Sequence, residues 1–345
     1  MDTRSFYRSC VLCPRNCGVD RAGGRRGFCG ETSKLRIASA VIHHGEEPPV
    51  SGRGGSGAVF VTGCNLGCVF CQNGQISGAG HNTAKGKGSP GMGRVVEAEE
   101  FVRICLALES RGAENINLVT GSHAVPALAA GLDAARNAGL AVPVLWNTSS
   151  YENPASLEIL KDRVDMYLPD LKTLDRGTAA EFLNAPDYGV HAAAAILKMM
   201  EYRPLKVIIR HLILPGHLES TRGVLRWFAA HARGRALLSL MTQFTPVPWG
   251  SFAGAPDRSL NREEYDTALR WLEEFDIEEG FFQGLEAEKN RDSVQAAGPG
   301  LSVKPDALPD FTEVNPFGVP GGEPPLAEPV WHWREGFCGT RQGPA

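Results

Sequence analysis

The chain has 345 residues, of which 43% are hydrophobic and 21% are charged, so it can build a globular core and is not a disordered or fibrous protein. Its formal net charge of −4 gives no reason to expect nucleic acid or an anionic membrane as a partner. No apolar run approaches the roughly 18 residues that a membrane helix requires, and the N-terminus lacks the apolar stretch of a signal peptide. We therefore expect a cytoplasmic protein.

Residues 1–36 form a short, basic module that is punctuated by glycine and contains four cysteines. Disulfides are unusual in a cytoplasmic chain, so clustered cysteines there are better explained as metal ligands. The four thiols fit tetrahedral zinc or a second iron–sulfur cluster, and their spacing does not decide between a structural metal and an electron relay. The candidate ligands of this second metal site are Cys10, Cys13, Cys17 and Cys29.

Residues 37–56 are expected to be a linker. This segment contains two adjacent histidines, His43 and His44, followed closely by Glu46 and Glu47. Such a group could face a substrate or bind a metal, but a turn with solvated charges is the commoner arrangement.

From about residue 57 to residue 283, short β-branched runs alternate with stretches of helical periodicity, which predicts βαβ units and a parallel sheet. The predicted strands are 58–63, 115–120, 142–147, 164–170, 207–214 and 236–243. The predicted helices are 97–111, 124–138, 154–162, 190–201, 221–232 and 261–275. Six strands with intervening helices fit an incomplete (β/α) barrel or a doubly wound open sheet.

Two segments have compositions that do not favour regular structure. Residues 77–93 are rich in glycine, lysine and serine and are predicted to form a mobile loop over the sheet. Residues 284–345 are rich in proline and glycine and are expected to be an irregular extension that wraps the domain or is partly disordered.

Cys105 lies on an apolar helical stripe and is expected in the core, whereas Cys338 receives no role.

Cys64, Cys68 and Cys71 directly follow the first predicted strand. Three thiolates at spacings of four and three residues can hold an iron–sulfur cube and leave one iron without a protein ligand, whereas ordinary electron-transfer clusters have four cysteines. A zinc loop with a fourth ligand from elsewhere fits this spacing poorly, because zinc sites usually pair two short knuckles. The pattern therefore favours a cluster with an open iron that can chelate another molecule.

The CxxxCxxC motif, with the aromatic Phe70 before its last cysteine, resembles the signature of the radical S-adenosylmethionine (SAM) enzymes. The sequence from Gly63 to Asn73 is similar to the activases of glycyl-radical enzymes, and in particular to pyruvate formate-lyase activating enzyme-like proteins. The resemblance runs from about residue 8 to residue 283. It implies an α/β fold, a partial (β/α)6 barrel of the radical SAM type at residues 57–283.

The same resemblance implies that the three cysteines bind a [4Fe–4S] cluster whose open iron binds SAM. An electron donor of the flavodoxin or ferredoxin class would then drive cleavage of SAM to a 5′-deoxyadenosyl radical, which abstracts a hydrogen atom. Further cofactor contacts are implied at Phe70, Asn73, Thr120, Gly121, Ser122, Asn147, Ser149, Asp170, Lys172, Arg210, His211 and Gln243. For each of these residues alone an ordinary structural role is commoner, and it is the agreement at successive strand ends that supports the set.

Three functions remain open at this point. The resemblance implies hydrogen abstraction, with the glycine backbone of a partner enzyme as one target. The same chemistry could instead modify a small molecule or another protein. A non-catalytic iron–sulfur carrier or scaffold is a different class, and it is disfavoured because a carrier needs the fourth cysteine that the 64–71 segment lacks.

Overall fold

The computed structural model describes residues 5–78, 91–247, 254–285, 309–313, 315, 317 and 327–338. Most of the loop predicted at 77–93, and most of the extension predicted at 284–345, lies outside these described residues. Within the described part of the chain, no helix combines the length and the hydrophobicity needed to cross a bilayer.

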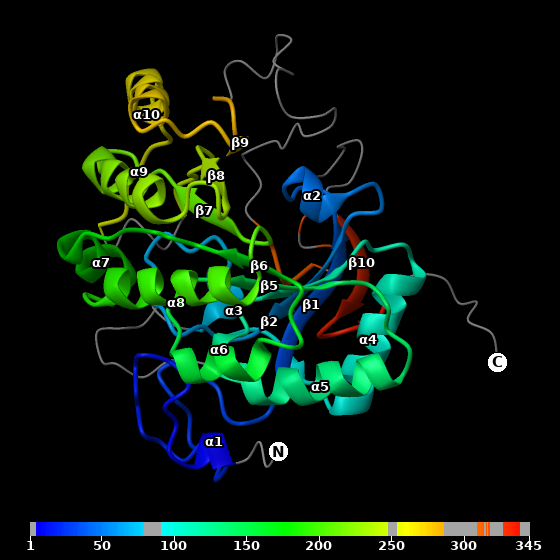
Figure 1. Ribbon diagram of the computed structural model, residues 1–345. Coiled ribbons are helices and arrows are strands. Elements are labelled where there is room, and N and C mark those ends of the chain that lie inside the picture. The colour runs from blue at the N-terminus through cyan, green and yellow to red at the C-terminus, as the bar shows by residue number, and fades with distance from the viewer. Residues whose placement is uncertain are drawn as a thin grey trace.

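A row of parallel strands occupies the centre of the molecule (Figure 1). The first four, which pair in this order, are β2 (Ser56–Val61), β4 (Ile116–Val119), β5 (Val144–Thr148) and β6 (Met166–Pro169). The row continues through β7 (Ile208–Leu212), β8 (Leu237–Met241) and the short β9 (Gly280–Phe282). Parallel bridges from Tyr167 to Val207 and from Asp170 to Arg210 join β6 to β7. Among the described strands β9 pairs only with β8, so the barrel is open, and the predicted partial barrel is confirmed.

Helices cover the outer face of this row, as βαβ connections require. They are α4 (Ala98–Ser110), α5 (Val125–Asn137), α6 (Pro154–Leu160), α8 (Tyr188–Tyr202), α9 (Leu218–His231) and α10 (Arg262–Glu274). Each predicted strand and helix is therefore present, with ends that differ by a few residues. Cys105 is fully buried between α4 and the sheet, as predicted. The structure adds α7 (Arg176–Leu183), which sequence periodicity did not predict.

The expected linker contains a strand of the main sheet, so that expectation was wrong. Six of the eight residues of β1 (Arg36–His43) are buried, and β1 pairs antiparallel with β2. Its other edge pairs antiparallel with β10 (Ala327–His332), so part of the extension expected to be irregular also belongs to the sheet. The β1–β10 pair joins residues almost 300 positions apart.

Several short elements lie outside the row of parallel strands and the long helices that cover it. They are α1 (Ser5–Arg8), α2 (Pro48–Ser51), α3 (Gly74–Ser77), β3 (Arg94–Val95), which pairs with β1, and β11 (Gly336–Phe337), which pairs with β10. In Figure 1 the N-terminal module with α1 lies below α6, at the opposite end of the molecule from α2 and α10. Hydrogen bonds from Asn153 and Ser156, at the start of α6, to the carbonyl oxygens of Val11 and Leu12 hold it there.

Candidate functional site

The three cysteines of the predicted cluster motif share one partly buried loop at the carboxyl end of β2. Burial raises the pKa of the Cys64 thiol to about 12, and nearby Cys71 raises it further. The pKa values of Cys68 and Cys71 are likewise raised by burial and are lowered in part by the nearby Lys172 ammonium. The three soft sulfur donors therefore occupy one water-poor place beside a cation, which suits a negatively charged iron–sulfur cluster.

The thiols are grouped but are not yet in ligand geometry. Among the described residues, no three His, Cys, Asp or Glu side chains are arranged closely enough to hold a metal ion. Binding of a cluster would displace the thiol protons and draw the sulfurs together.

The loop that carries the cysteines is anchored through its backbone. The N–H groups of Gly67 and Val69 donate to the carbonyl oxygens of Leu183 and Phe182 at 3.1 and 3.0 Å. Both carbonyls belong to the last turn of α7, so the helix that periodicity missed supports the predicted site. Phe70 is buried against Phe244, with ring centroids 6.1 Å apart, and shields the loop from water.

Asp170 and Lys172 follow β6, and their side chains meet. The Lys172 ammonium donates to Asp170 at 2.6 Å. Burial alone would lower the pKa of Lys172, but the Asp170 carboxylate and the Cys68 sulfur raise it above its usual range. The Tyr188 hydroxyl lies 2.9 Å from the carbonyl oxygens of both Asp170 and Ser149, which fixes this pair. A permanently charged ammonium is thus held beside the thiols.

Arg210 points into the barrel and meets two carboxylates from the segment expected to be a linker. Its guanidinium donates to Glu47 at 2.9 Å and makes further ion pairs with Glu46 and Glu47. The side chains of all three residues are 15% exposed or less, so the expected turn with solvated charges is wrong. Asn117, a buried residue of β4, donates to Glu46 at 3.2 Å. The local sequence could not show this, because the partner lies more than 160 residues away.

His211 faces away from the barrel interior, which corrects the prediction that it contacts the cofactor. Neighbouring residues of a strand point to opposite faces, so His211 faces α9 when Arg210 faces inward. Its ring nitrogens lie 2.7 Å from the carbonyl oxygen of Leu171 and 2.9 Å from the Thr221 hydroxyl. Burial lowers its pKa to about 4, so the ring is neutral and both nitrogens are engaged within the protein.

Polar residues after β4 and β5 lie side by side at the same end of the sheet. The Thr120 N–H donates to the carbonyl oxygen of Asn147 at 2.9 Å, and Gly121 follows directly. The Ser149 hydroxyl is buried and has no hydrogen-bond partner among the described residues, which is a feature expected of a group that meets a ligand. The Ser122 hydroxyl, in contrast, donates to Glu152 at 2.9 Å.

Glu152 is a buried carboxylate that sequence reasoning missed. It also accepts from the Trp146 indole at 2.8 Å and from Thr148, and burial raises its pKa. The only sequence signal was a charged residue inside a Ser- and Asn-rich turn, which is typical of a surface loop.

The last two predicted contacts lie on either side of this end of the barrel. Asn73 precedes the first turn of α3, directly after the cysteine loop. Gln243 follows β8 and accepts a hydrogen bond from Gln283 at 3.2 Å.

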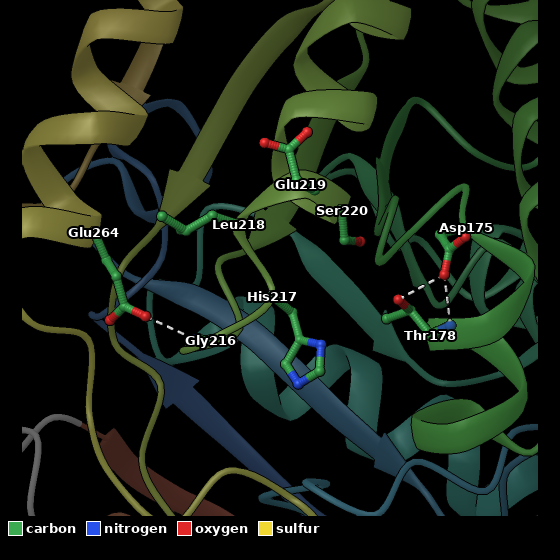
Figure 2. Close-up of a pocket in the computed structure, with 8 residues that line it drawn as sticks. All are labelled: Asp175, Thr178, Gly216, His217, Leu218, Glu219, Ser220 and Glu264. Atoms are coloured by element: carbon green, nitrogen blue, oxygen red, sulfur yellow. Dashed lines mark hydrogen bonds between the residues drawn. The ribbon is translucent and has the colours of Figure 1, made fainter.

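A cavity of about 490 Å³ is present elsewhere in the described part of the chain, and no residue of the cysteine loop lines it (Figure 2). It lies between the loops after β6 and β7, with His217 and Ser220 on one side and Asp175 and Thr178 on the other. Asp175 caps α7 by accepting from the Thr178 N–H at 2.7 Å. None of the predicted cofactor contacts lines this cavity.

Residues 58–228 match the family model of the Radical SAM superfamily. The chain belongs to this superfamily, whose members use a [4Fe–4S] cluster and SAM. Across 277 residues it is 27% identical to an uncharacterised protein of Methanocaldococcus jannaschii, a match that covers 80% of this chain and 77% of the relative.

Several solved structures are similar to parts of this chain at low sequence identity. SuiB of Streptococcus suis bound to its precursor peptide SuiA is 15% identical, with a TM-score of 0.44 over 65% of this chain and 47% of that chain. The FeFe-hydrogenase maturase HydG of Carboxydothermus hydrogenoformans is 14% identical, with a TM-score of 0.45 over 61% of this chain and 49% of that one. A radical SAM methyltransferase of Sphaerobacter thermophilus is 17% identical, with a TM-score of 0.42 over 64% of each chain. This chain spans about half the length of the first two, and the likeness is too low to transfer a substrate or a partner.

Proposed function

We propose that the chain is a radical SAM enzyme that abstracts a hydrogen atom from its substrate, with Cys64, Cys68 and Cys71 as the ligands of its [4Fe–4S] cluster. The observation that carries this proposal is the grouping of three partly buried thiols, without a fourth cysteine in the loop, at the carboxyl end of a parallel strand. When bound, the cluster and SAM supply a 5′-deoxyadenosyl radical for hydrogen abstraction.

The residues around the loop would bind, orient and exclude water. Lys172, held by Asp170, offsets the negative charge of the thiolates. Phe70 keeps water out, and the unpartnered Ser149 hydroxyl and the half-buried Asn147 amide offer polar groups to the SAM amino acid moiety. The predicted contacts at Asn73, Thr120, Gly121 and Gln243 stay predictions.

The target that we propose is the glycine backbone of a partner enzyme, with an electron donor of the flavodoxin or ferredoxin class. Support comes from the similarity to activases between Gly63 and Asn73 and at Asp170-Leu171-Lys172. This is an inference by family analogy, and its test must therefore follow the abstracted atom itself.

Cys68→Ala is expected to abolish the SAM-binding cluster and the formation of 5′-deoxyadenosine, because two thiolates cannot hold the cube. The measurement is the EPR spectrum of the reduced, reconstituted protein with and without SAM, together with 5′-deoxyadenosine by chromatography. Cys105→Ala is the matched control, since Cys105 is a buried core thiol far from the motif, and it should retain both signals. A Cys68→Ala protein that still cleaves SAM would contradict the proposal.

The glycine target is tested with peptides that carry deuterium at the glycine Cα. Transfer of that atom gives deuterated 5′-deoxyadenosine, which mass spectrometry detects. If every such peptide yields only unlabelled 5′-deoxyadenosine, glycine is not the target. That result would favour the alternative, in which the target is a small molecule or a different protein site.

A further inference from the structure

The N-terminal module brings four thiols together that the proposed radical SAM site does not use. Cys10, Cys13 and Cys29 are buried, and Cys17 is partly buried. A Cβ atom placed on Gly27 would lie 3.3 Å from the Cys17 sulfur and 3.4 Å from the Cys29 sulfur, so both sulfurs border the same small space. The Cys17 thiol also lies 4.0 Å from the carbonyl oxygen of Cys10. The Cys13 thiol interacts electrostatically with Cys10 and Cys29, so the four cysteines lie near one another although they span 20 positions of the sequence. As at the Cys64 loop, no three of them stand in metal-ligand geometry among the described residues.

A buried arginine beside these thiols provides an independent observation. Arg21 is only 1% exposed. Its guanidinium donates to the carbonyl oxygens of Glu31, Thr32 and His123 at 3.1, 2.6 and 2.8 Å, and to the Cys10 sulfur at 3.5 Å. The three carbonyl oxygens carry no net charge.

No carboxylate of the described residues forms an ion pair with Arg21. The Glu31 carboxylate is paired with Arg36 at 2.9 Å. A buried cation without a counter-charge is strongly unfavourable. Four thiolates around one Zn²⁺ leave a net charge of about −2, which would balance the charge of Arg21. An iron–sulfur cluster with four thiolate ligands is also anionic.

We propose that Cys10, Cys13, Cys17 and Cys29 bind a single metal centre through sulfur, either zinc or an iron–sulfur cluster, and that Arg21 is its buried counter-cation. Binding releases the thiol protons to solvent and forms metal–sulfur bonds, with no change in the oxidation state of the protein.

The position of this centre gives it a second role, as a support for the Cys64 loop. Arg15, between two of the cysteines, donates to the carbonyl oxygen of Asn65 at 2.9 Å. Arg21 donates to the carbonyl oxygen of His123, whose ring in turn donates to the carbonyl oxygen of Thr62 at 2.8 Å. Thr62 lies two residues before Cys64, so a metal that fixes the module also fixes the start of the cysteine loop.

Metal counting on a full-length variant without the proposed catalytic ligands tests the site. The protein carrying Cys64→Ala, Cys68→Ala and Cys71→Ala, purified without oxygen from cells supplied with zinc and iron, should retain about one zinc, or the iron and sulfide of about one cluster. Adding Cys13→Ala should remove this metal, whereas adding Cys105→Ala should not. A triple variant that contains neither zinc nor iron would overturn the site.

The same comparison can be made without the triple variant, which covers the case in which that variant does not fold. Cys13→Ala alone should lower the metal content of the otherwise unchanged protein by one centre, and Cys105→Ala should leave it intact. If Cys13→Ala and Cys105→Ala have equal metal contents, the proposal is wrong. Neither measurement depends on SAM cleavage, so the site and the proposed radical chemistry can fail separately.

The role of Arg21 is tested by Arg21→Gln, which keeps hydrogen-bond donors but removes the charge. Loss of the counter-cation should speed transfer of the metal to a chromogenic chelator by roughly tenfold or more. Removing a group that hydrogen-bonds to a metal ligand typically weakens metal binding to this extent. Arg25→Gln, at an exposed position of the same module, is the control and should leave the rate unchanged. Equal rates for the two variants would exclude Arg21 as the counter-cation.

Discussion

At the scale of single residues, Arg21 and Arg210 show two ways in which this chain buries a cation. Arg210 is surrounded by the carboxylates of Glu46 and Glu47, which raise its pKa above its usual range against the opposing effect of burial. The same contact holds the pKa of Glu47 below its usual range, although burial alone would raise it. Arg21 instead meets carbonyl oxygens and sulfur. The carboxylates that pair with Arg210 lie far away in the sequence. The sulfur that Arg21 contacts belongs to Cys10, a proposed metal ligand.

Arg210→Leu should destabilise the protein by about 3–5 kcal/mol, because it leaves two buried carboxylates without a counter-charge. Urea unfolding at neutral pH measures the loss. Arg233→Leu removes an exposed ion pair with Asp276 and should cost less than about 1 kcal/mol.

Adding Glu46→Gln and Glu47→Gln to Arg210→Leu should recover part of the stability, since no uncompensated charge then remains. If Arg210→Leu lowers the free energy of unfolding no more than Arg233→Leu does, the buried ion pairs of Arg210 with Glu46 and Glu47 do not stabilise the protein as described.

At the scale of elements, the start of α10 joins a helix cap to the loop after β7. The Asn261 side chain accepts from the Glu264 N–H at 2.9 Å, and Glu264 accepts from the Asn261 N–H at 3.0 Å, which is a capping box. Glu264 also accepts from the Gly216 N–H at 2.6 Å. Its hydrogen bond with Arg258 lowers its pKa from 4.5 to about 2. One carboxylate thus ties α10 to the rim of the cavity shown in Figure 2.

Glu264→Gln should destabilise the protein by about 1–2 kcal/mol at pH 7, and Glu263→Gln, at the exposed neighbouring position, by much less. Because the pKa of Glu264 is lower in the folded state, its stabilising effect is present above about pH 4.5 and is lost as the pH falls toward 2. Urea unfolding of both variants and the parent at pH 7, 5 and 3 measures this.

The difference between the parent and Glu264→Gln should therefore shrink at pH 3. A difference that stays constant between pH 7 and pH 3 would show that the charge of Glu264 is not what matters.

The elements also differ in how far local sequence predicts them. The long helices and the strands that follow them were predictable, because burial gives the apolar residues of a helix and those of a strand different sequence periods. α7 was not, because its eight residues are barely two turns and include Gly177, so no apolar stripe can be recognised. Only Asp175, which caps it, carried a local signal.

At the scale of the whole molecule, the sheet is completed by residues from near both ends of the chain. β10 covers the edge of β1 that the parallel row leaves open, and it places the fully buried Trp331 against the core. The Trp331 indole donates to Glu100 of α4 at 3.0 Å. The C-terminal strand is therefore part of the folding unit and not an appendage.

Trp331→Ala should destabilise the protein by about 3–5 kcal/mol, through lost burial and the cavity that it leaves. Phe337→Ala, in the same segment but with 44% of the residue exposed, should cost about 0.5 kcal/mol. Thermal or urea unfolding of both variants makes the comparison. Similar losses for the two would contradict the assignment of β10 to the core sheet.

The sequence by itself determined the alternation of parallel strands and helices and the radical SAM motif. Short stretches of sequence contain both signals. The period of the apolar residues predicts the strands and helices, and the spacing of three cysteines gives the motif.

Only the tertiary structure decided which face His211 occupies, what Glu46 and Glu47 pair with, and that β1 lies between β2 and β10. Each depends on contacts between residues far apart in the chain, for which a linear pattern holds no signal. The same is true of Arg21, whose burial beside four thiols became visible only when the module was placed against the barrel.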